Sequence, residues 1–352
     1  MTTTLDPVRQ TPKPRPAAQR WRSLLLGRDA AVIGLVALVW IAGSVFVDNF
    51  GKPNTVYFLL LDALPILLIA MPMTMVIISA EIDLSVASML GLSSVVVGVL
   101  FQGGWPIWAA VAVALAVGLV GGALNGFLVA TVGLPSLAVT VATLALFRGI
   151  AVGLLGTKAV TGFPDEHKDL VSDRLFGPGT AIPGILLVFV VLAIGFGVLL
   201  HFTPFGRATY AAGMSARTSR FSGVNVPAVK FWLFVATGFV SALAGVYWTL
   251  RYDSARGDNA AGFELAVVAA VLVGGVSIFG GRGAIPGVIA GALLIGELRA
   301  VLRLADVSAD AINIATGVLL IVSVIVPRLV TGLHGRWRRA RRSGLESTSS
   351  SD

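Results

Sequence analysis

Residues 84–147 read LSVASMLGLSSVVVGVLFQGGWPIWAAVAVALAVGLVGGALNGFLVATVGLPSLAVTVATLALF, a run of 64 residues without Asp, Glu, Lys, Arg or His. The hydrocarbon core of a bilayer is about 30 Å thick, and a helix needs roughly 20 apolar residues to cross it. The run therefore has room for about three spans, separated at 103–106 (Gly-Gly-Trp-Pro) and at 133–135 (Gly-Leu-Pro). It predicts a membrane protein, because a soluble domain has no use for an uncharged run of this length.

The composition of the whole chain agrees with that prediction. Of its 352 residues, 56% are hydrophobic and only 12% are charged, and the mean hydropathy is +0.89. The 41 glycines suit membrane helices that pack closely through small residues. We expect one transmembrane domain over 30–330, between a basic arm at 1–29 and a basic, Ser-rich tail at 331–352, because neither end has the apolar residues to build a core.

The inventory of charged and ligating residues excludes several other classes. The net charge of +8 does not indicate nucleic-acid binding, since the basic residues gather at the chain ends and in one internal loop. With no cysteine and three scattered histidines (His167, His201 and His334), the chain has no disulfide framework, thiolate metal site or histidine cluster. We expect no metal, no cofactor and no nucleic-acid partner.

Apolar segments predict an all-α polytopic membrane protein with about ten transmembrane helices. The first segment holds 18 apolar residues, Ala30 to Val47, which is longer than the apolar core of a signal peptide, so we expect an uncleaved span. The expected spans are 30–47, 56–79, 84–101, 107–131, 136–155, 182–201, 229–250, 264–280, 286–304 and 311–328.

The distribution of Lys and Arg predicts the orientation. The arm at 1–29, the loop at 202–230 and the segment from Arg328 onward together hold 16 of the 26 basic residues. An even number of spans places all three on one side, and the positive-inside rule makes that side the cytoplasm. We therefore expect a multi-pass protein of the bacterial cytoplasmic membrane with both termini in the cytoplasm.

A weak internal repeat is visible. The segment GALNGFLV at 122–129 aligns with GELRAVLR at 296–303, and each follows a Gly-rich span introduced by an acid. The corresponding halves, spans 2 to 5 and 7 to 10, would run in opposite directions, as in transporters with an inverted repeat. Chance alignment of Gly-, Ala- and Leu-rich helices explains the similarity equally well.

Motifs of energy conversion and catalysis are absent from the sequence. No G-x-x-x-x-G-K-[ST] motif is present to bind ATP phosphates, so nucleotide energy has to come from a partner. The sequence also lacks the motifs H-E-x-x-H and G-x-S-x-G and a His–carboxylate set, any of which would indicate an enzyme. The sequence therefore predicts a transport subunit without an ATPase of its own.

Three segments together resemble the permease subunits of ABC sugar importers of the ribose, rhamnose and autoinducer-2 group, within the branched-chain amino acid/ribose permease superfamily. The resemblance extends from about residue 30 to 330, with Ala87 and Ser215 as departures from the family pattern. The segments are MTMVIISAEIDLSVASML at 73–90, TPFGRATYAAG at 203–213, and FELAVVAAVLVGGVSIFGGRG at 263–283.

This resemblance implies a function and a set of partners. A permease of this kind imports a monosaccharide or related polyol that an extracytoplasmic solute-binding protein delivers. It pairs with a second permease copy or a paralogue, and a cytoplasmic ABC ATPase supplies the energy. The alternative is an ion-coupled secondary transporter with inverted repeats, which would carry an ion or proton site within its spans.

Six residues are candidates for the substrate pathway, and each has a structural alternative. Asp83 and Ser85 precede a span, where they either cap the helix or face the solute. Glu264 gains from a helix N-terminus but is costly inside a membrane unless it faces water or protein. Asn125 bonds either a sugar hydroxyl or a neighbouring helix. The paired glycines Gly274 and Gly275 permit a gate or merely close packing.

The loop at 202–229 is the candidate ATPase-coupling segment. It is longer than a connector needs, and its basic residues are either topology markers or contacts to the ATPase. The candidate coupling residues are Gly206, Arg207, Gly213, Arg217, Arg220, Ser222 and Gly223.

Asp62 and Arg148 lie just inside predicted spans, where we expect them to form a structural ion pair or to reach toward a surface.

Overall fold

A computed structural model describes residues 28–308, 310–322 and 325. The described chain is helical and contains no strand, only two isolated β-bridges, Val160 to Ala255 and Arg174 to Pro183. Most of the predicted basic arm and all of the predicted tail lie outside the described residues. The all-α prediction is therefore confirmed for the described part.

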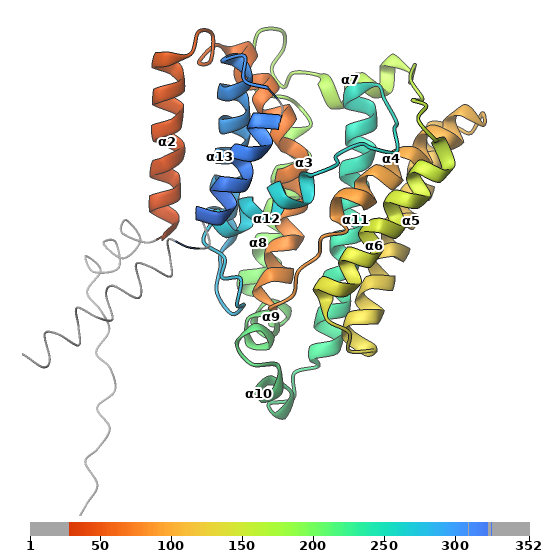
Figure 1. The fold of residues 1–352 in the computed structure, drawn as a ribbon, viewed down its shortest axis with the longest axis vertical. Helices are drawn as coiled ribbons and strands as arrows, with labels where there is room; N and C mark the ends of the chain where they lie inside the picture. The colour runs from red at the N-terminus through yellow and green to blue at the C-terminus, as the bar shows by residue number, and fades with distance from the viewer. Residues whose placement is uncertain (1–27, 309, 323–324, 326–352) are drawn as a thin grey trace, which may run out of the picture.

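Figure 1 shows how the helices are arranged. In chain order they are α2 (Arg28–Phe46), α3 (Pro53–Ile78), α4 (Val86–Gln102), α5 (Ile107–Gly126), the π-helix η1 (Phe127–Thr131), α6 (Ser136–Leu155), α7 (Asp165–Ser172), α8 (Leu186–Phe202), α9 (Pro204–Met214), α10 (Ala216–Phe221), α11 (Val226–Tyr252), α12 (Phe263–Val273) and α13 (Ile285–Leu304), followed by the apolar helix Asp310–Val322.

Every expected span overlaps an apolar helix, but not all of these helices are long. In the described chain, five helices are long and apolar enough to cross a membrane: α3, α5 with η1, α6, α11 and α13. The pair α8 and α9, bent by 67°, makes up to a sixth. Four shorter apolar helices, Val32–Phe46, Val86–Gln102, Phe263–Val273 and Asp310–Val322, coincide with the remaining expected spans.

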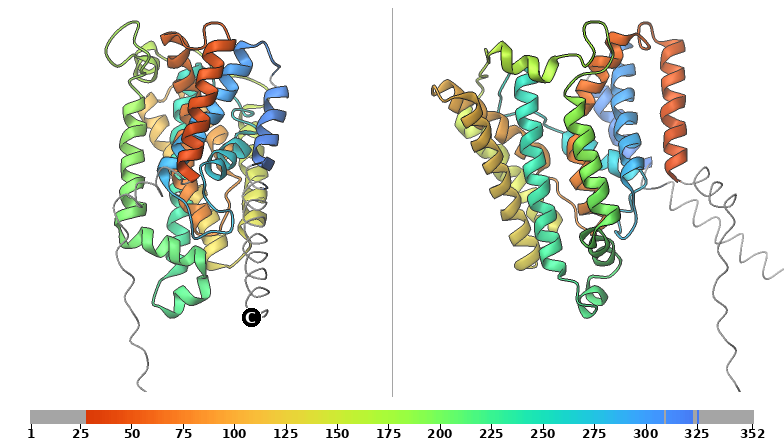
Figure 2. Two further views of the ribbon diagram at one scale, coloured as in Figure 1. Left: turned by 90° about the vertical axis from the view of Figure 1, so that its left-hand side faces the viewer. Right: turned by 180° about the vertical axis from the view of Figure 1, so that it is seen from behind.

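Helix α3 forms the centre of the molecule. From residue 63 onward all of its side chains are buried, and α8, α11, α12 and α13 pack around it. The outer helices α2, α6 and α8 instead expose large apolar side chains, as expected for surfaces that face lipid. Helices α9 and α10 lie at one end of the molecule, here called the α9 end, and α7 lies at the other, the α7 end (Figures 1 and 2).

Glycines bring α5 and α11 into backbone contact. Gly118, Gly122 and Gly126 repeat at every fourth residue of α5 and so share one face of the helix. A Cβ atom on Gly122 would lie 2.4 Å from the Phe234 carbonyl oxygen, and one on Gly118 would lie 2.6 Å from the Gly238 carbonyl oxygen. This close approach is the small-residue packing expected between membrane helices.

Two of the non-helical segments between apolar helices, 79–85 and 274–284, contact each other and other helices. Backbone groups in an apolar interior need hydrogen-bond partners, and in the first segment α6 provides partners for Ile82. The Ile82 N–H donates to Ser136 Oγ at 3.2 Å, and Thr140 Oγ1 donates to the Ile82 carbonyl at 3.3 Å. The two segments also meet, since a Cβ atom on Gly280 would lie 2.8 Å from Ala80 Cβ, and Gly281 N–H donates to the carbonyl of Ile78, the last residue of α3, at 2.8 Å.

Candidate functional site

Four polar side chains from three parts of the chain form a buried network, here called the Asp83 network: Asp83, Ser85, Asn125 and Thr237. Asp83 Oδ1 accepts hydrogen bonds from Ser85 N–H at 2.9 Å and from Ser85 Oγ at 2.6 Å. Thr237 Oγ1 of α11 donates to Asp83 Oδ2 at 2.9 Å, and Asn125 Nδ2 of α5 donates to Ser85 Oγ at 2.8 Å. Both carboxylate oxygens of Asp83 are thereby satisfied inside the protein.

The network is sealed from solvent in this structure. Its four residues are at most 2% exposed. Asn125 Oδ1 is buried without a hydrogen-bond partner among the described residues, and the helix changes from α to π one residue beyond Gly126. Three of the six pathway candidates, Asp83, Ser85 and Asn125, are thus brought together. Together with Thr237 they join the 79–85 segment to α5 and α11, and Asp83 accepts a hydrogen bond from the N–H of Ser85, the residue that precedes α4.

The other three pathway candidates lie elsewhere. Glu264 occupies the first turn of α12, and its carboxylate forms no hydrogen bond or ion pair with a described residue. Gly274 packs against α13, since a Cβ atom there would lie 2.5 Å from Val288 Cα. Gly275 ends α12 with φ +92°, a conformation that favours glycine. These glycines shape the junction between α12 and the 274–284 segment.

The expected pairing of Asp62 with Arg148 is wrong. Arg148 Nη1 donates to the main-chain carbonyls of Gly257 at 2.7 Å and Asn259 at 2.8 Å, so this arginine binds the connection between α11 and α12. Carbonyl oxygens can substitute for a carboxylate because the guanidinium presents several donors in one plane. This contact could not be predicted from the positions of these residues in the sequence.

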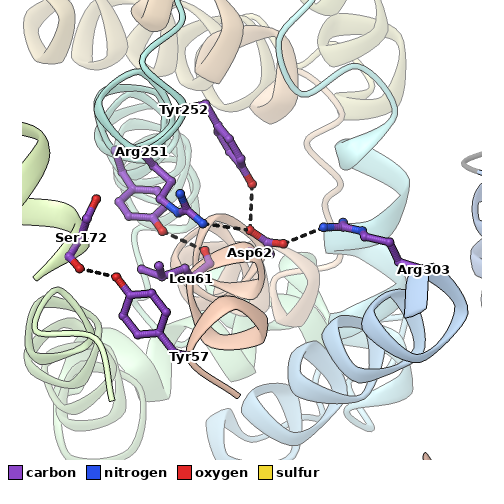
Figure 3. A network of polar contacts seen from close by, with 8 residues as sticks. Tyr57, Leu61, Asp62, Ser172, Arg251, Tyr252 and Arg303 are labelled. Carbon is purple, nitrogen blue, oxygen red and sulfur yellow. Dashed lines mark hydrogen bonds and ion pairs between the residues drawn. The ribbon is translucent and has the colours of Figure 1, made fainter. Parts of the chain in front are cut away.

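Asp62 instead gathers partners from α11 and α13 in what we call the Asp62 cluster: Asp62, Arg251, Tyr252 and Arg303 (Figure 3). Arg303 Nη1 lies 2.8 Å from Asp62 Oδ2, while Tyr252 Oη donates to Asp62 Oδ1 at 3.0 Å. Arg251 Nη2 lies 3.8 Å from the same Oδ1 atom. The cluster ties α3, α11 and α13 together toward the α7 end.

A second ion pair joins α11 to the segment that follows α3. Lys230 Nζ contacts Glu81 Oε1, and both side chains are largely shielded, with 18% and 14% of their surface exposed. Lys230 lies in the second turn of α11, near the α9 end. Neither this pair nor Thr237 was recognised from the sequence, where Lys230 had no visible acid partner within helical spacing.

The candidate coupling residues divide into two groups. Arg207, Arg217 and Arg220 are exposed on α9 and α10, as are Ser222 and Gly223 beyond them. Gly206 and Gly213 are packing positions: a Cβ atom on Gly206 would lie 1.9 Å from the Leu200 carbonyl oxygen, and one on Gly213 would lie 1.8 Å from the Ile78 carbonyl oxygen. The exposed group is free to meet another molecule, while the two glycines fit α9 against α8 and α3.

Helix α9 touches the 274–284 segment and the last residue of α3, which directly precedes the 79–85 segment. Gly213 abuts Ile78, directly before the 79–85 segment, and also Gly281. Tyr210 Oη donates to the Gly283 carbonyl at 2.7 Å. A displacement of α9 would therefore reach the 274–284 segment directly and the 79–85 segment through Ile78.

Two cavities lie outside the Asp83 network. A cavity of about 340 Å³ separates α9 from the start of α11 and is lined by Phe205, Val229 and Trp232 among others. A cavity of about 870 Å³ lies between the start of α3 and the loop after α7, with Asn54 and Arg174 on its wall. Among the described residues no group of His, Asp or Glu side chains has the arrangement of a metal site.

Comparisons with known proteins agree with the predicted family. The sequence profile of the family described as branched-chain amino acid transport system / permease component matches residues 55–324. The autoinducer 2 import system permease protein LsrD of Salmonella paratyphi A is 35% identical over 329 residues, 91% of this chain and 97% of that protein. The LsrD protein of Yersinia enterocolitica is 34% identical over 300 residues (82% and 89%), and that of Klebsiella pneumoniae is 33% identical over 293 residues (82% and 86%). No solved structure matches the chain.

Proposed function

The chain belongs to the branched-chain amino acid transport system / permease component family, and from that premise we propose that it is the membrane-spanning permease of a binding-protein-dependent ABC importer. Its solute is a monosaccharide or related polyol, similar to rhamnose, ribose or autoinducer 2. A partner subunit hydrolyses the ATP that drives inward transport. The LsrD relatives, which are named as permease proteins of an autoinducer 2 import system, support this proposal.

The contacts of α9 are the observation that carries the proposal. Its Arg207 side chain is exposed, whereas Gly213 contacts Ile78, directly before the 79–85 segment, and both Gly213 and Tyr210 contact the 274–284 segment. A cytoplasmic ATPase that moves α9 would thereby displace the 79–85 segment, which holds Asp83 and Ser85. In this proposal Arg207, Arg217 and Arg220 meet the ATPase, while Gly206 and Gly213 transmit its motion.

The proposed topology has ten spans. The four shorter apolar helices complete the long ones, and the two non-helical segments lie within the membrane region where protein surrounds them. The α9 end then faces the cytoplasm together with both termini, as the distribution of basic residues favours. The α7 end receives the solute-binding protein outside the cell.

Substrate passage in this proposal requires a second permease, either another copy of this chain or a paralogue. The binding protein selects the solute, so the pathway needs few specific contacts. The Asp83 network, rather than Glu264, Gly274 or Gly275 alone, is the polar centre that the pathway passes when the helices move. No covalent chemistry is assigned to this chain.

Purification from native membranes tests the proposal. The expected result is co-purification of this chain with an ABC ATPase and a solute-binding protein, and ATP-dependent uptake of one member of a labelled panel of monosaccharides and polyols. An intact chain that associates with neither partner and accumulates solute along an ion gradient would support the secondary-transporter alternative instead.

A further inference from the structure

Both ends of α11 are tied to α3 or to the segment directly after it. Near the α9 end, Lys230 pairs with Glu81, three residues beyond the end of α3. Toward the α7 end, Arg251 and Tyr252 meet Asp62 on α3, and Arg303 adds the ion pair from α13. At each end of α11 a basic residue contacts an acid, on α3 at one end and in the segment after α3 at the other.

The two contacts are separated by the thickness of a membrane. Lys230 and Arg251 are 21 residues apart on one uninterrupted helix. At a rise of about 1.5 Å per residue, this spacing is about 31 Å, close to the hydrocarbon thickness of about 30 Å. The contacts therefore lie near the two boundaries of the membrane, where water can hydrate the charges when a contact breaks.

The space between the contacts is closed. Thr237, seven residues beyond Lys230, is fully buried and donates to Asp83. Further along α11, Tyr247 Oη donates to the Leu61 carbonyl at 2.8 Å. With Lys230–Glu81 and the Asp62 cluster both formed, α11 is in contact with the α3 region on either side of the Asp83 network, whose residues are at most 2% exposed.

We propose that the Lys230–Glu81 pair and the Asp62 cluster are two gates, and that opening either one exposes the Asp83 network to that end of the molecule only. The inference rests on the proposed transport function, because gates at opposite boundaries are what alternating access requires. It assigns a role to charged residues that lie outside the pathway and coupling candidates.

The two connected elements differ in a way that permits separate opening. Helix α3 contains Pro65 and Pro72, each of which removes a backbone hydrogen bond and weakens the helix between the two acids. Helix α11 has proline only in its first turn and is otherwise continuous. One end of the α3 region can therefore move from α11 while the other end remains in contact.

Ser241 offers a reporter position midway between the gates. It lies 11 residues after Lys230 and 10 before Arg251, it is fully buried, and its hydroxyl has no hydrogen-bond partner among the described residues. The chain contains no cysteine, so Ser241→Cys introduces a single thiol without removing a bond. Its labelling by a membrane-impermeant maleimide can be followed in right-side-out and inside-out vesicles carrying the full chain.

The proposal predicts one-sided changes in labelling. Glu81→Gln should raise the labelling rate of Ser241→Cys about tenfold from the α9 side and leave the α7 side unchanged, as expected when an open minor state becomes more populated. Asp62→Asn should do the reverse. The exchanged pair Glu81→Lys with Lys230→Glu should restore protection.

Asp165→Asn provides the matched control, because it removes an exposed ion pair with Lys168 (2.8 Å) at the α7 end without touching α3 or α11. This variant should leave labelling unchanged. Equal increases from both sides, or no increase in either variant while Ser241→Cys is labelled normally after denaturation, would overturn the gate assignment. Labelling needs neither ATPase nor solute, so the gates are tested separately from the importer proposal, which depends on uptake.

Discussion

The hydroxyl group of Tyr247 donates a hydrogen bond to the main-chain carbonyl oxygen of Leu61, at 2.8 Å, four residues before Pro65. In an uninterrupted helix, the N–H of residue 65 would donate to this carbonyl, but proline has no N–H. Tyr247, on α11, supplies the missing donor to α3. A break in one helix is thus repaired by a side chain of another, which fixes how the two elements pack.

Tyr247→Phe should lower stability by about 1 kcal/mol, because it leaves a buried carbonyl without a donor. The measurement is thermal unfolding of the detergent-solubilised protein. In a Pro65→Ala background the alanine N–H can take over the bond, so the same substitution should cost less there. Equal costs in both backgrounds would show that the two residues are not coupled.

Gly122→Ala should destabilise the protein by about 1 to 3 kcal/mol, because the added Cβ atom meets the backbone of α11 at Phe234 and Val235. Gly149→Ala is the control within another helix, since nothing lies within 4 Å of its Cβ position. That control should be neutral or stabilising by up to about 1 kcal/mol through helix propensity. Similar unfolding temperatures for the two variants would contradict the close packing of α5 on α11.

Glu297→Gln should raise stability by about 1 kcal/mol or more. Glu297 of α13 is buried, and its Oε2 atom has no hydrogen-bond partner among the described residues, so a neutral amide of the same shape avoids the cost of burying an acid. Glu81→Gln, which removes the partner of Lys230, should act in the opposite direction. Thermal unfolding of both variants checks the difference in sign.

Arg148→Gln should loosen the connection between α11 and α12, because the carbonyls of Gly257 and Asn259 lose their shared donor. Hydrogen exchange in residues 253–262 should accelerate about tenfold, as expected for local opening. Arg256→Gln removes only an exposed ion pair with Asp258 and should leave exchange elsewhere in the segment near its original rate. A rise confined to Arg256→Gln would contradict the role given to Arg148.

Arg207→Glu combined with Arg217→Glu should abolish ATP-driven uptake and weaken co-purification of the ATPase, while the unfolding temperature stays within the error of the measurement. Both side chains are exposed and make no polar contact within the described chain, so their replacement leaves the fold intact. Retained uptake in the double variant would place the ATPase contact elsewhere.

The positions of the helices follow largely from the sequence because hydrophobicity is a local property. Each expected span, such as 107–131 or 136–155, falls on an apolar helix. The lengths were less predictable. The expected span 264–280 contains a helix only over Phe263–Val273, because Gly274 and Gly275 end it and the chain continues without helical structure.

The polar contacts depended on tertiary structure and were only partly predictable. Asp83 and Ser85 stood out because they precede a helix, but Thr237 is 154 residues from Asp83 and sits in an apolar stretch without any motif. Asp62 was recognised as needing a partner inside a span, yet its partner Arg303 is 241 residues away. Such pairs arise from helix packing, which periodicity and composition do not encode.

The proposed function makes this chain a conduit whose energy comes from a separate ATPase. The most direct measurement is uptake of the labelled solute into proteoliposomes that contain this chain, its ATPase and the solute-binding protein. We expect uptake with ATP and an active ATPase, and no uptake beyond that of empty liposomes with an ATPase variant that cannot hydrolyse ATP. Uptake driven by an ion gradient in the absence of the ATPase would contradict it.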